Sequence, residues 1–328
     1  MNIQEAAKKL LAGDLVVFPT ETVYGLGAVS NNDAAVKKIF EVKGRPSINP
    51  LILHIASPEQ LPELVEKISF DAELLMSHFW PGPLTICFKK SARVSDLVTA
   101  GLPTVCIRNP SHPVAQELLK LVGQPIAAPS ANLSGKPSTT TFSDAKQQLE
   151  NKGVAFLDGG ESPLGLESTV VDCSGGTVKL LRPGVISRNQ IEAIIKEPII
   201  DESESTSISS PGQLLTHYAP SGRLTVLRGK REARRAWISS ELPPNIEGIA
   251  LGIVGDFKGL AADMPNYVLA EREDDLQMYA KRLYQFLNWC DARGAKEIIL
   301  ELPSQDSPLL LALINRLEKA SNGNILKV

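Results

Sequence analysis

The first 27 residues, MNIQEAAKKLLAGDLVVFPTETVYGLG (1–27), contain the pattern that decides the fold. Apolar side chains recur at positions 3, 6, 7, 10 and 11, which is the spacing of one face of a helix. Asn2 and Glu5 can form a capping box at its start, and Gly13 suits the left-handed position after its end. The apolar run 15–18 then predicts a buried strand, and a polar turn follows it. A helix, a buried strand and a polar turn in this order indicate an α/β domain with ligands at its strand ends.

The same kind of pattern continues over the first 200 residues. A second helix is predicted near 33–40, and Ser-Pro-Glu-Gln (57–60) combines an N-cap, a first-turn proline and glutamine at N3, which predicts a helix start. Further strands are predicted at 51–55, 84–88, 104–108, 125–128, 154–157 and 168–173. Because helices separate only some of these strands, we expect a mixed sheet rather than a purely parallel one.

The second part of the chain follows a polar break. The segment DESESTSISS (201–210) is acidic, rich in serine and almost free of large apolar residues, so it is typical of a solvated linker. From about residue 223 the pattern restarts and predicts a small α/β unit, with strands at 224–227, 249–254 and 297–301, a basic helix after the first strand, helices at 273–293 and 307–320, and a short last strand. A length of 328 residues also suits two domains of about 150 residues each.

Composition limits the class of protein. Hydrophobic residues make up 43% of the chain and charged residues 22%, which is enough apolar material for a core and argues against a disordered or fibrous chain. The 34 basic and 37 acidic residues give a net charge of −3, whereas proteins that bind nucleic acid through phosphate neutralisation are usually basic. Any anion must therefore be bound by a local basic site. The start of the chain has no apolar signal region, and no apolar run approaches the roughly 20 residues of a membrane span, so we expect a cytoplasmic protein without membrane contact.

The four cysteines are widely spaced. Cys87, Cys106, Cys173 and Cys290 form no CxxC pair, so a zinc site or a thioredoxin-type motif is not expected. Three of them lie in apolar, strand-like runs, which predicts buried free thiols.

Polar residues of the first domain cluster in turns rich in glycine and proline. Six segments contain them: PTETVYGLG (19–27), KGRPSINPLILH (43–54), WPGPLT (80–85), Thr104 with Arg108, APSANLSGKPS (128–138), and ESTVVD (167–172) followed by LLRPG (180–184). Lys43 and Arg45 lie in a predicted loop, where they could clamp a triphosphate or simply face solvent. Arg108 ends a predicted strand, and Arg182 ends the short run Leu180-Leu181-Arg182. At such a position an arginine can bind a carboxylate or phosphate, or form a structural ion pair.

Other residues in these segments permit two interpretations each. His54 ends a buried strand, so it is either a core histidine or a base. Ser130, Asn132 and Ser138 could bind a nucleotide or form side-chain turns. The pattern Gly-Leu-Gly (25–27) matches only the start of a dinucleotide fingerprint, and tight turns with positive φ explain it as well. Motifs for a protein nucleophile are missing, so an enzyme here would work by positioning and electrostatic stabilisation of a charged substrate.

Taken together and in this order, the segments resemble the YrdC-type threonylcarbamoyl-AMP synthases, and SPGQLLTHYAP (210–220) with an α/β tail resembles the two-domain form of that enzyme. The resemblance implies a twisted mixed sheet with flanking helices, joined by a linker to a small Rossmann-like domain. It divides the chain into a YrdC-like catalytic domain (1–200), a linker that closes over the active site (201–222) and a C-terminal α/β domain (223–328). The implied reaction converts L-threonine, bicarbonate and ATP into threonylcarbamoyl-AMP and pyrophosphate, for modification of a tRNA adenosine beside the anticodon.

The resemblance also assigns residues by motif position. Arg108 would pair with the carboxylate or carbamate end of threonine and, with Lys43 and Arg45, would form the catalytic set. The implied threonine contacts are Thr22, His54, Arg108, Ala128 and Ser168. The implied ATP contacts are Lys43, Arg45, Asn49, Thr104, Ser130, Ser138, Arg182 and, closing over the nucleotide from the linker, Tyr218.

Magnesium is expected to arrive with ATP, without a dedicated protein cage. Proteins that transfer the threonylcarbamoyl group to tRNA are the expected downstream partners, and stable binding of tRNA itself is not expected. The alternative is an RNA-binding module, for which the support is a basic stretch at Arg228, Lys230, Arg231, Arg234 and Arg235. As a helix face, that stretch is more typical of a solvated surface.

Overall fold

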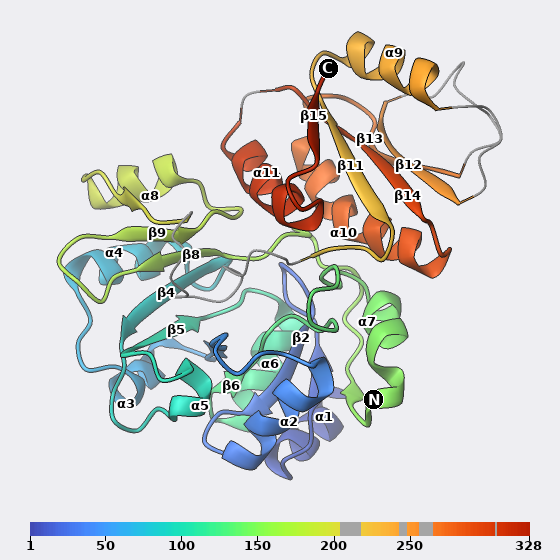
Figure 1. The fold of residues 1–328 in the computed structure, drawn as a ribbon. Helices are drawn as coiled ribbons and strands as arrows, with labels where there is room; N and C mark the ends of the chain where they lie inside the picture. The colour runs from blue at the N-terminus through green and yellow to red at the C-terminus, as the bar shows by residue number, and fades with distance from the viewer. Residues whose placement is uncertain (204–217, 243–247, 256–264, 306) are drawn as a thin grey trace. The chain divides into compact units, whose positions relative to one another are not determined.

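The computed structural model describes residues 1–203, 218–242, 248–255, 265–305 and 307–328. The chain forms two compact units, residues 1–134 with 138–214 and residues 135–137 with 215–328, shown in Figure 1. Most of the predicted linker (201–222) and of the segment 210–220 lies outside the described residues, but Tyr218 is described. None of the described helices is both long and apolar enough to cross a bilayer.

The first unit is built on a mixed ten-stranded sheet of order β10-β9-β8-β4-β5-β3-β6-β2-β1-β7. Its strands are β1 (Val16–Phe18), β2 (Gly25–Val29), β3 (Ile52–His54), β4 (Leu84–Lys89), β5 (Thr104–Arg108), β6 (Ile126–Ala127), β7 (Ala155–Phe156), β8 (Thr169–Asp172), β9 (Lys179–Arg182) and β10 (Ile200–Asp201). Strand β3 pairs with β5 in parallel, while β4 pairs with β5 in antiparallel fashion. The predicted mixed sheet is therefore confirmed.

Helices of the first unit flank this sheet. They are α1 (Ile3–Leu11), α2 (Asp33–Lys43), the 3-10 turn η1 (Pro58–Gln60), α3 (Leu61–Leu64), α4 (Phe70–Phe79), α5 (Asp96–Thr99), α6 (Pro113–Val122), α7 (Phe142–Leu149), the 3-10 turn η2 (Glu150–Lys152) and α8 (Arg188–Ile195). Asn2 and Glu5 form the predicted capping box of α1, and Gly13 has a φ of 86° just after its end. The helix predicted from Ser57 does begin at Pro58, but its first turn is 3-10.

Strand β2 was not predicted. Gly25 and Gly27 were expected in tight turns with positive φ, but both are paired strand residues without positive φ. What excludes a larger residue is close packing, because a Cβ on Gly27 would lie 2.8 Å from Ile126 Cγ2 and 2.9 Å from the Phe18 ring.

Alternation along the central strands separates a core face from a site face. On β3, Leu53 points into the main hydrophobic core, so its neighbours Ile52 and His54 point to the opposite face. On that opposite face, a small apolar cluster contains Ile52, Cys87, Cys106, Val170 and Leu181.

The prediction that all four cysteines are free thiols is wrong for two of them. Cys87 and Cys106 are paired across β4 and β5 and form a disulfide. The two cysteines are 19 residues apart, so the sequence alone does not indicate that they pair. The register of two antiparallel strands places them opposite each other. Cys173 and Cys290 are free and buried, as predicted.

The second unit has a five-stranded parallel sheet of order β13-β12-β14-β11-β15. Its elements are β11 (Arg223–Arg228), α9 (Arg231–Glu241), β12 (Ile249–Val254), β13 (Asn266–Ala270), α10 (Leu276–Ala292), β14 (Glu297–Leu302), α11 (Pro308–Ala320) and β15 (Ile325–Lys327). Figure 1 shows α9 on one face of this sheet and α10 and α11 on the other. Among the described elements of this unit, only strand β13, at the sheet edge, was not predicted.

We expected the basic stretch at the start of α9 to be a solvated helix face, but part of it is buried. Arg234 is fully buried and forms ion pairs with Glu273 and Glu301. Arg235 also lies 3.0 Å from Glu301, whereas Arg228 is exposed. The carboxylates that pair with these arginines lie some 40 to 70 residues further along the chain, so the local sequence does not indicate them.

Candidate active site

The predicted site residues of the first unit gather around the central strands. His54 and Arg108 are register partners on β3 and β5, and Thr85 is the partner of Arg108 on β4. Side chains at paired positions share one face of a sheet, so these three form a row across it. The Thr85 hydroxyl lies 2.7 Å from the Ser168 hydroxyl, which extends the row towards β8.

Arg108 is held on three sides. Its Nε donates to the Gly82 carbonyl at 3.3 Å, Nη1 donates to Thr22 Oγ1 at 2.7 Å, and Nη2 lies 2.7 Å from Glu21 Oε1. The Thr20 hydroxyl accepts from the backbone N–H groups of Thr22 and Val23 and thereby fixes the turn that carries two of these partners. A guanidinium has five N–H donors, so three contacts among the described residues leave two for a ligand.

Two ionisable side chains next to Arg108, His54 and Glu21, have pKa values below their usual ones. Burial, and then the positive charge of Arg108, lower the pKa of His54 to about 3, so its imidazole is neutral at physiological pH. The ring packs edge-on against Phe18, and Nδ1 has no hydrogen-bond partner among the described residues. Burial acts to raise the pKa of Glu21, but Arg108 and two backbone hydrogen bonds together outweigh it, so that the pKa is lowered and the carboxylate stays ionised. Neither group is therefore poised as a base near neutral pH.

Lys43 is the last residue of α2 rather than a loop residue, because Gly44 adopts the left-handed conformation that ends the helix. Its ammonium donates to the Ser130 carbonyl at 2.6 Å and to the Asn132 carbonyl. Burial, together with the nearby charge of Arg45, lowers the pKa of Lys43 well below its usual value. In this position, Lys43 fixes the backbone of the segment that contains Ser130.

Arg45 and Asn49 lie in the turn after α2. Arg45 donates to the carbonyls of Asn49, at 3.2 Å, and of Pro50, at 2.7 Å. The Asn49 amide is buried, and neither of its polar atoms has a hydrogen-bond partner within the part of the chain that the structure describes. A buried amide without partners is uncommon and suits a group that binds a ligand.

A second set of contacts joins Ser138, Ser168 and Arg182. Ser138 donates to Glu167 Oε1 at 2.6 Å, and Arg182 Nη2 donates to the Ser168 carbonyl at 2.9 Å and to its hydroxyl at 3.1 Å. Ala128 follows β6, where its N–H donates to the Ile52 carbonyl.

Thr104 is not part of this row, and Tyr218 belongs to the other unit. Thr104 begins β5, four residues from Arg108, which corresponds to about 13 Å along a strand. Tyr218 belongs to the second unit, where its ring lies 5.6 Å from Tyr284 and 5.5 Å from the Arg316 guanidinium.

Sequence reasoning missed the buried carboxylates. Glu21 and Glu167 were not among the predicted site residues, but they are buried beside Arg108 and Ser138. Both lie within quoted motifs, Pro-Thr-Glu-Thr and Glu-Ser-Thr. A lone acidic residue among small apolar and hydroxyl residues next to a strand was the signal that could have identified them.

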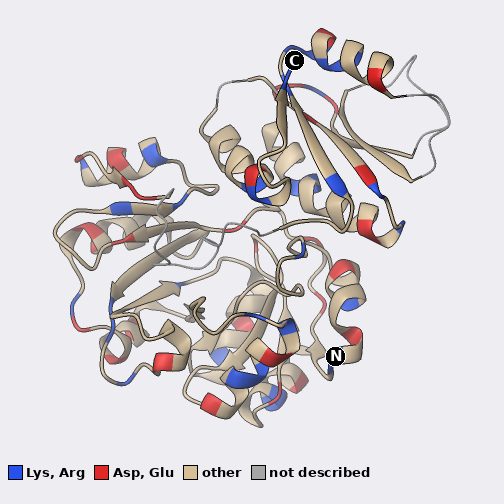
Figure 2. Cartoon of the chain, viewed as in Figure 1, with Lys and Arg blue, Asp and Glu red and all other residues tan. Residues whose placement is uncertain are grey.

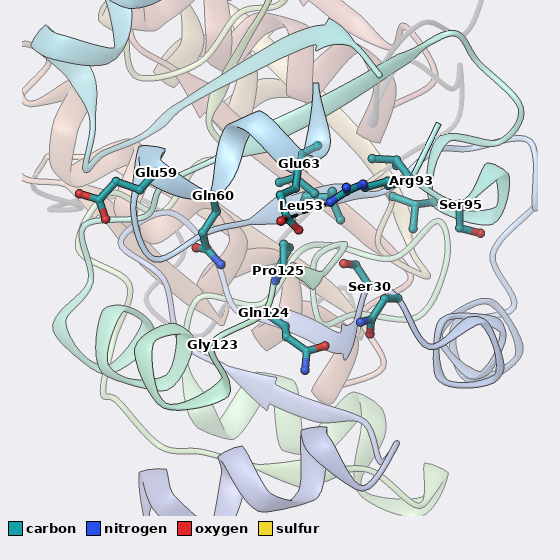
Figure 3. Close-up of a pocket in the computed structure, with 14 residues that line it drawn as sticks. Ser30, Leu53, Glu59, Gln60, Glu63, Arg93, Ser95, Gly123, Gln124 and Pro125 are labelled. Atoms are coloured by element: carbon teal, nitrogen blue, oxygen red, sulfur yellow. Dashed lines mark ion pairs between the residues drawn. The ribbon is translucent and has the colours of Figure 1, made fainter. Parts of the chain in front are cut away.

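A separate cavity of about 480 Å³ lies on the core side of β3 (Figure 3). Leu53 lines it together with Gln124 and the ion pair of Glu63 and Arg93, which are 3.2 Å apart. None of the predicted site residues lines this cavity, so we do not assign it to the active site.

Charges on the helices are mixed in sign. Figure 2 shows Lys and Arg interspersed with Asp and Glu along the helices of each unit, without an extended basic face in this view. The basic groups of the site are the buried ones described above, which suits a small anion better than a long polyanion.

Comparisons with known proteins agree with this architecture. Residues 8–184 match the family model for Sua5, YciO and YrdC, which is described as "Telomere recombination". Residues 186–322 match the model "Threonylcarbamoyl-AMP synthase, C-terminal domain".

Curated relatives and a solved structure extend the similarity to the full chain. Threonylcarbamoyl-AMP synthase of Pyrococcus abyssi is 42% identical over 332 residues, covering 100% of this chain and 96% of the relative. The protein of the same name from Bacillus subtilis is 42% identical over 331 residues, covering 99% and 94%. The crystal structure of P. abyssi Sua5 complexed with L-threonine has a TM-score of 0.91 and 40% identity, covering 99% of this chain and 96% of that one. This chain therefore belongs to the threonylcarbamoyl-AMP synthase family of enzymes.

Proposed function

We propose that this enzyme makes threonylcarbamoyl-AMP and pyrophosphate from L-threonine, bicarbonate and ATP. The observation that carries the proposal is Arg108, a buried guanidinium at a strand end with two N–H donors left for a carboxylate. The relative of known structure is described as complexed with L-threonine, which supports the same amino acid here. The product would supply the threonylcarbamoyl group for a tRNA adenosine beside the anticodon.

The proposed residue roles are those that the motif positions of the family imply. Arg108 binds the carboxylate or carbamate end of threonine, while Thr22, His54, Ala128 and Ser168 surround the rest of it. Lys43, Arg45, Asn49, Thr104, Ser130, Ser138 and Arg182 hold ATP. Thr104 is far from Arg108 along β5, and an extended nucleotide can span that separation. Tyr218 closes over the nucleotide from the linker.

The chemistry does not require a protein nucleophile. The threonine amine attacks the carbon of carbon dioxide derived from bicarbonate and loses a proton, which gives a carbamate. A carbamate oxygen then attacks the α-phosphorus of ATP, the bond to the β-phosphate bridging oxygen breaks, and pyrophosphate leaves. The carbamate, the threonine carboxylate and the ATP phosphates are all anionic and must meet in this step. The buried side chains that offset the repulsion between these anions, and so lower the barrier, are Lys43, Arg45, Arg108 and Arg182.

Magnesium is proposed to enter with the triphosphate. Bound there, it would neutralise charge on the phosphate oxygens. Glu21 and Glu167 are buried carboxylates that contact Arg108 and Ser138, so both are already engaged with protein partners. Among the described residues, no group of three or more His, Cys, Asp or Glu side chains could hold a metal ion. The donor set therefore fits a metal held mainly by ATP.

The test is a calorimetric titration with ATP and a panel of amino acids, paired with a pyrophosphate-release assay in bicarbonate buffer. We expect threonine to bind more tightly than serine or valine, and pyrophosphate to appear only when threonine, bicarbonate and ATP are all present. Equal binding of the three amino acids, or pyrophosphate release without threonine, would contradict the proposal. We further propose a cytoplasmic location and transfer proteins, rather than stably bound tRNA, as the partners that receive the product.

A further inference from the structure

Glu21 is a buried acid that none of the assigned roles uses. Its side chain is 7% exposed and that of its partner Arg108 is 4% exposed. Removing a carboxylate from water is costly, and a buried ion pair by itself is weak support for stability. A buried pair at this position therefore calls for an explanation other than stability of the fold.

The geometry around Arg108 supplies one. Gly82, Thr22 and Glu21 contact three different nitrogens of the guanidinium, Nε, Nη1 and Nη2 respectively. Contacts at three different nitrogens restrict the rotation of the group as well as its position. Paired N–H···O bonds to a carboxylate require the plane of the guanidinium to be set, because each of the two donors must point at its own carboxylate oxygen.

Glu21 is held in place at its backbone as well as through its side chain. Both of its carboxylate oxygens are shielded from solvent, and the turn that carries it is fixed by a backbone bond from Leu164 N–H to the Glu21 carbonyl, at 2.9 Å. The ion pair with Arg108 is thus a fixed connection between Glu21 and the group that is proposed to bind threonine.

We propose that Glu21 is a positioning residue, which fixes the plane of the Arg108 guanidinium and thereby sets the affinity for the carboxylate of threonine. The inference rests on the proposed function, because it takes Arg108 as the group that binds this carboxylate. It predicts that the reach of the Glu21 side chain matters more than its charge.

Three substitutions separate reach from charge. Glu21→Gln keeps an acceptor oxygen at the same reach and loses the charge. Glu21→Asp keeps the charge but is one carbon–carbon bond shorter, which withdraws the oxygens by about 1.5 Å. Glu21→Ala loses both.

Steady-state pyrophosphate release would be measured against threonine and, separately, against ATP. For Glu21→Ala and Glu21→Asp, we expect the KM for threonine to rise about ten- to hundredfold, the cost of losing a hydrogen bond between charged groups. For Glu21→Gln, we expect it to return to within about fivefold of the wild-type value. The KM for ATP should stay within about twofold in all three, since none of the ATP contacts changes.

Glu63→Gln is the matched control, because Glu63 pairs with Arg93 in the same unit but both side chains are largely exposed. It should leave both KM values unchanged. If Glu21→Ala does not fold, as judged by circular dichroism, the comparison of Glu21→Asp with Glu21→Gln still decides the question.

Three results would overturn the inference. The KM for threonine could stay within twofold in Glu21→Ala, both KM values could rise together, or Glu21→Asp could act like wild type while Glu21→Gln acts like alanine. All three presuppose a wild-type enzyme that releases pyrophosphate in response to threonine. Without that response, the proposed function itself fails, so the two failures are distinguishable.

Discussion

His54 and Arg108 lie directly opposite each other on the parallel strands β3 and β5, on the face of the sheet that carries the candidate site. A fixed positive charge beside a buried imidazole opposes its protonation. The neutral form of His54 is consequently built into the fold, where it can act as a hydrogen-bond partner but not as a cation.

The first prediction follows from the pKa of His54, which burial and Arg108 lower from 6.5 to about 3. Above pH 6.5, His54 is neutral in both folded and unfolded chains. As the pH falls from 6.5 towards 3, the unfolded chain gains a proton that the folded chain refuses, so the free energy of unfolding decreases. The His54→Gln variant should lack this loss, with a slope up to about 1.4 kcal/mol per pH unit shallower.

Urea unfolding of wild type and His54→Gln at several pH values between 4.5 and 7.5 provides the measurement. Carboxylates titrate in both proteins, so the difference between the two curves isolates His54. His78→Gln is the control, because His78 is exposed and its removal should leave the curve nearly parallel to that of the wild type. Parallel curves for His54→Gln as well would show that His54 titrates normally.

Arg108→Ala should abolish threonine-dependent pyrophosphate release while ATP binding stays within about threefold of wild type. The reason is that Arg108 contacts Gly82, Thr22 and Glu21, whereas Lys43 contacts Ser130 and Asn132, so the substitution leaves the contacts of Lys43 intact. Pyrophosphate release and calorimetric ATP binding measure the two effects separately. Arg93→Ala removes an exposed arginine of the same unit and should change neither. Near-normal turnover in Arg108→Ala would exclude this residue from threonine binding.

Lys43→Met should weaken both ATP binding and folding. The Lys43 ammonium donates to the carbonyls of Ser130 and Asn132. The substitution leaves both carbonyls without this donor, which should lower the free energy of unfolding by about 1–3 kcal/mol. Calorimetry with ATP should show at least a tenfold weaker affinity, since about 1.4 kcal/mol of binding free energy is a factor of ten.

The matched control is Lys38→Met. Lys38 also donates to a backbone carbonyl, that of Gly13 at 2.9 Å, but away from the proposed ATP contacts. It should cost stability without a change in ATP affinity. Equal ATP affinities in Lys43→Met and wild type would mean that Lys43 only supports the fold.

Local sequence predicted the parts of the fold that local physics determines. The α1 helix begins and ends where its capping box and glycine predict, and β5 spans 104–108 as its apolar run indicates. Strand β2 was missed because its glycines suggest a turn, whereas Gly27 is required by the close approach of Ile126 and the Phe18 ring.

The site shows the same division. Arginines at strand ends could be identified from the sequence, because the position of a residue in a strand is a local property. The partner of Arg108 could not, since Glu21 lies 87 residues earlier and only the sheet order places the two together. The ion pairs of Arg234 were missed for the same reason.

Gly27→Ala tests the close approach at β2. The added Cβ would lie 2.8 Å from Ile126 Cγ2 and 2.9 Å from the Phe18 ring, so neighbouring core groups must shift. Overpacking of this kind costs about 1–3 kcal/mol of unfolding free energy. Chemical denaturation of Gly27→Ala against Gly176→Ala gives the comparison, because a Cβ on Gly176 meets nothing within 4 Å. Equal stability of the two variants would show that β2 relaxes without cost.

The Cys87–Cys106 disulfide leads to the last prediction. Both cysteines are buried in the apolar cluster on the site face, two residues along their strands from Thr85 and Arg108. Alkylation in denaturant without a reductant should therefore modify two cysteines, and after reduction all four. Reaction of all four without reductant would mean that the bond is not formed.

Because the bond is shielded, a reductant should reach it mainly when the chain opens, so reduction of the folded enzyme should be slow and should accelerate in mild denaturant. Once reduced, the enzyme should lose about 3 kcal/mol of unfolding free energy, as expected for opening a loop of this length. The Cys87→Ala/Cys106→Ala variant is the control, since its stability should not respond to reductant. If reduction leaves the free energy of unfolding of the wild type unchanged, the hydrogen bonds between β4 and β5 and the apolar cluster hold the two strands together. The disulfide then does not stabilise the strand that carries Arg108.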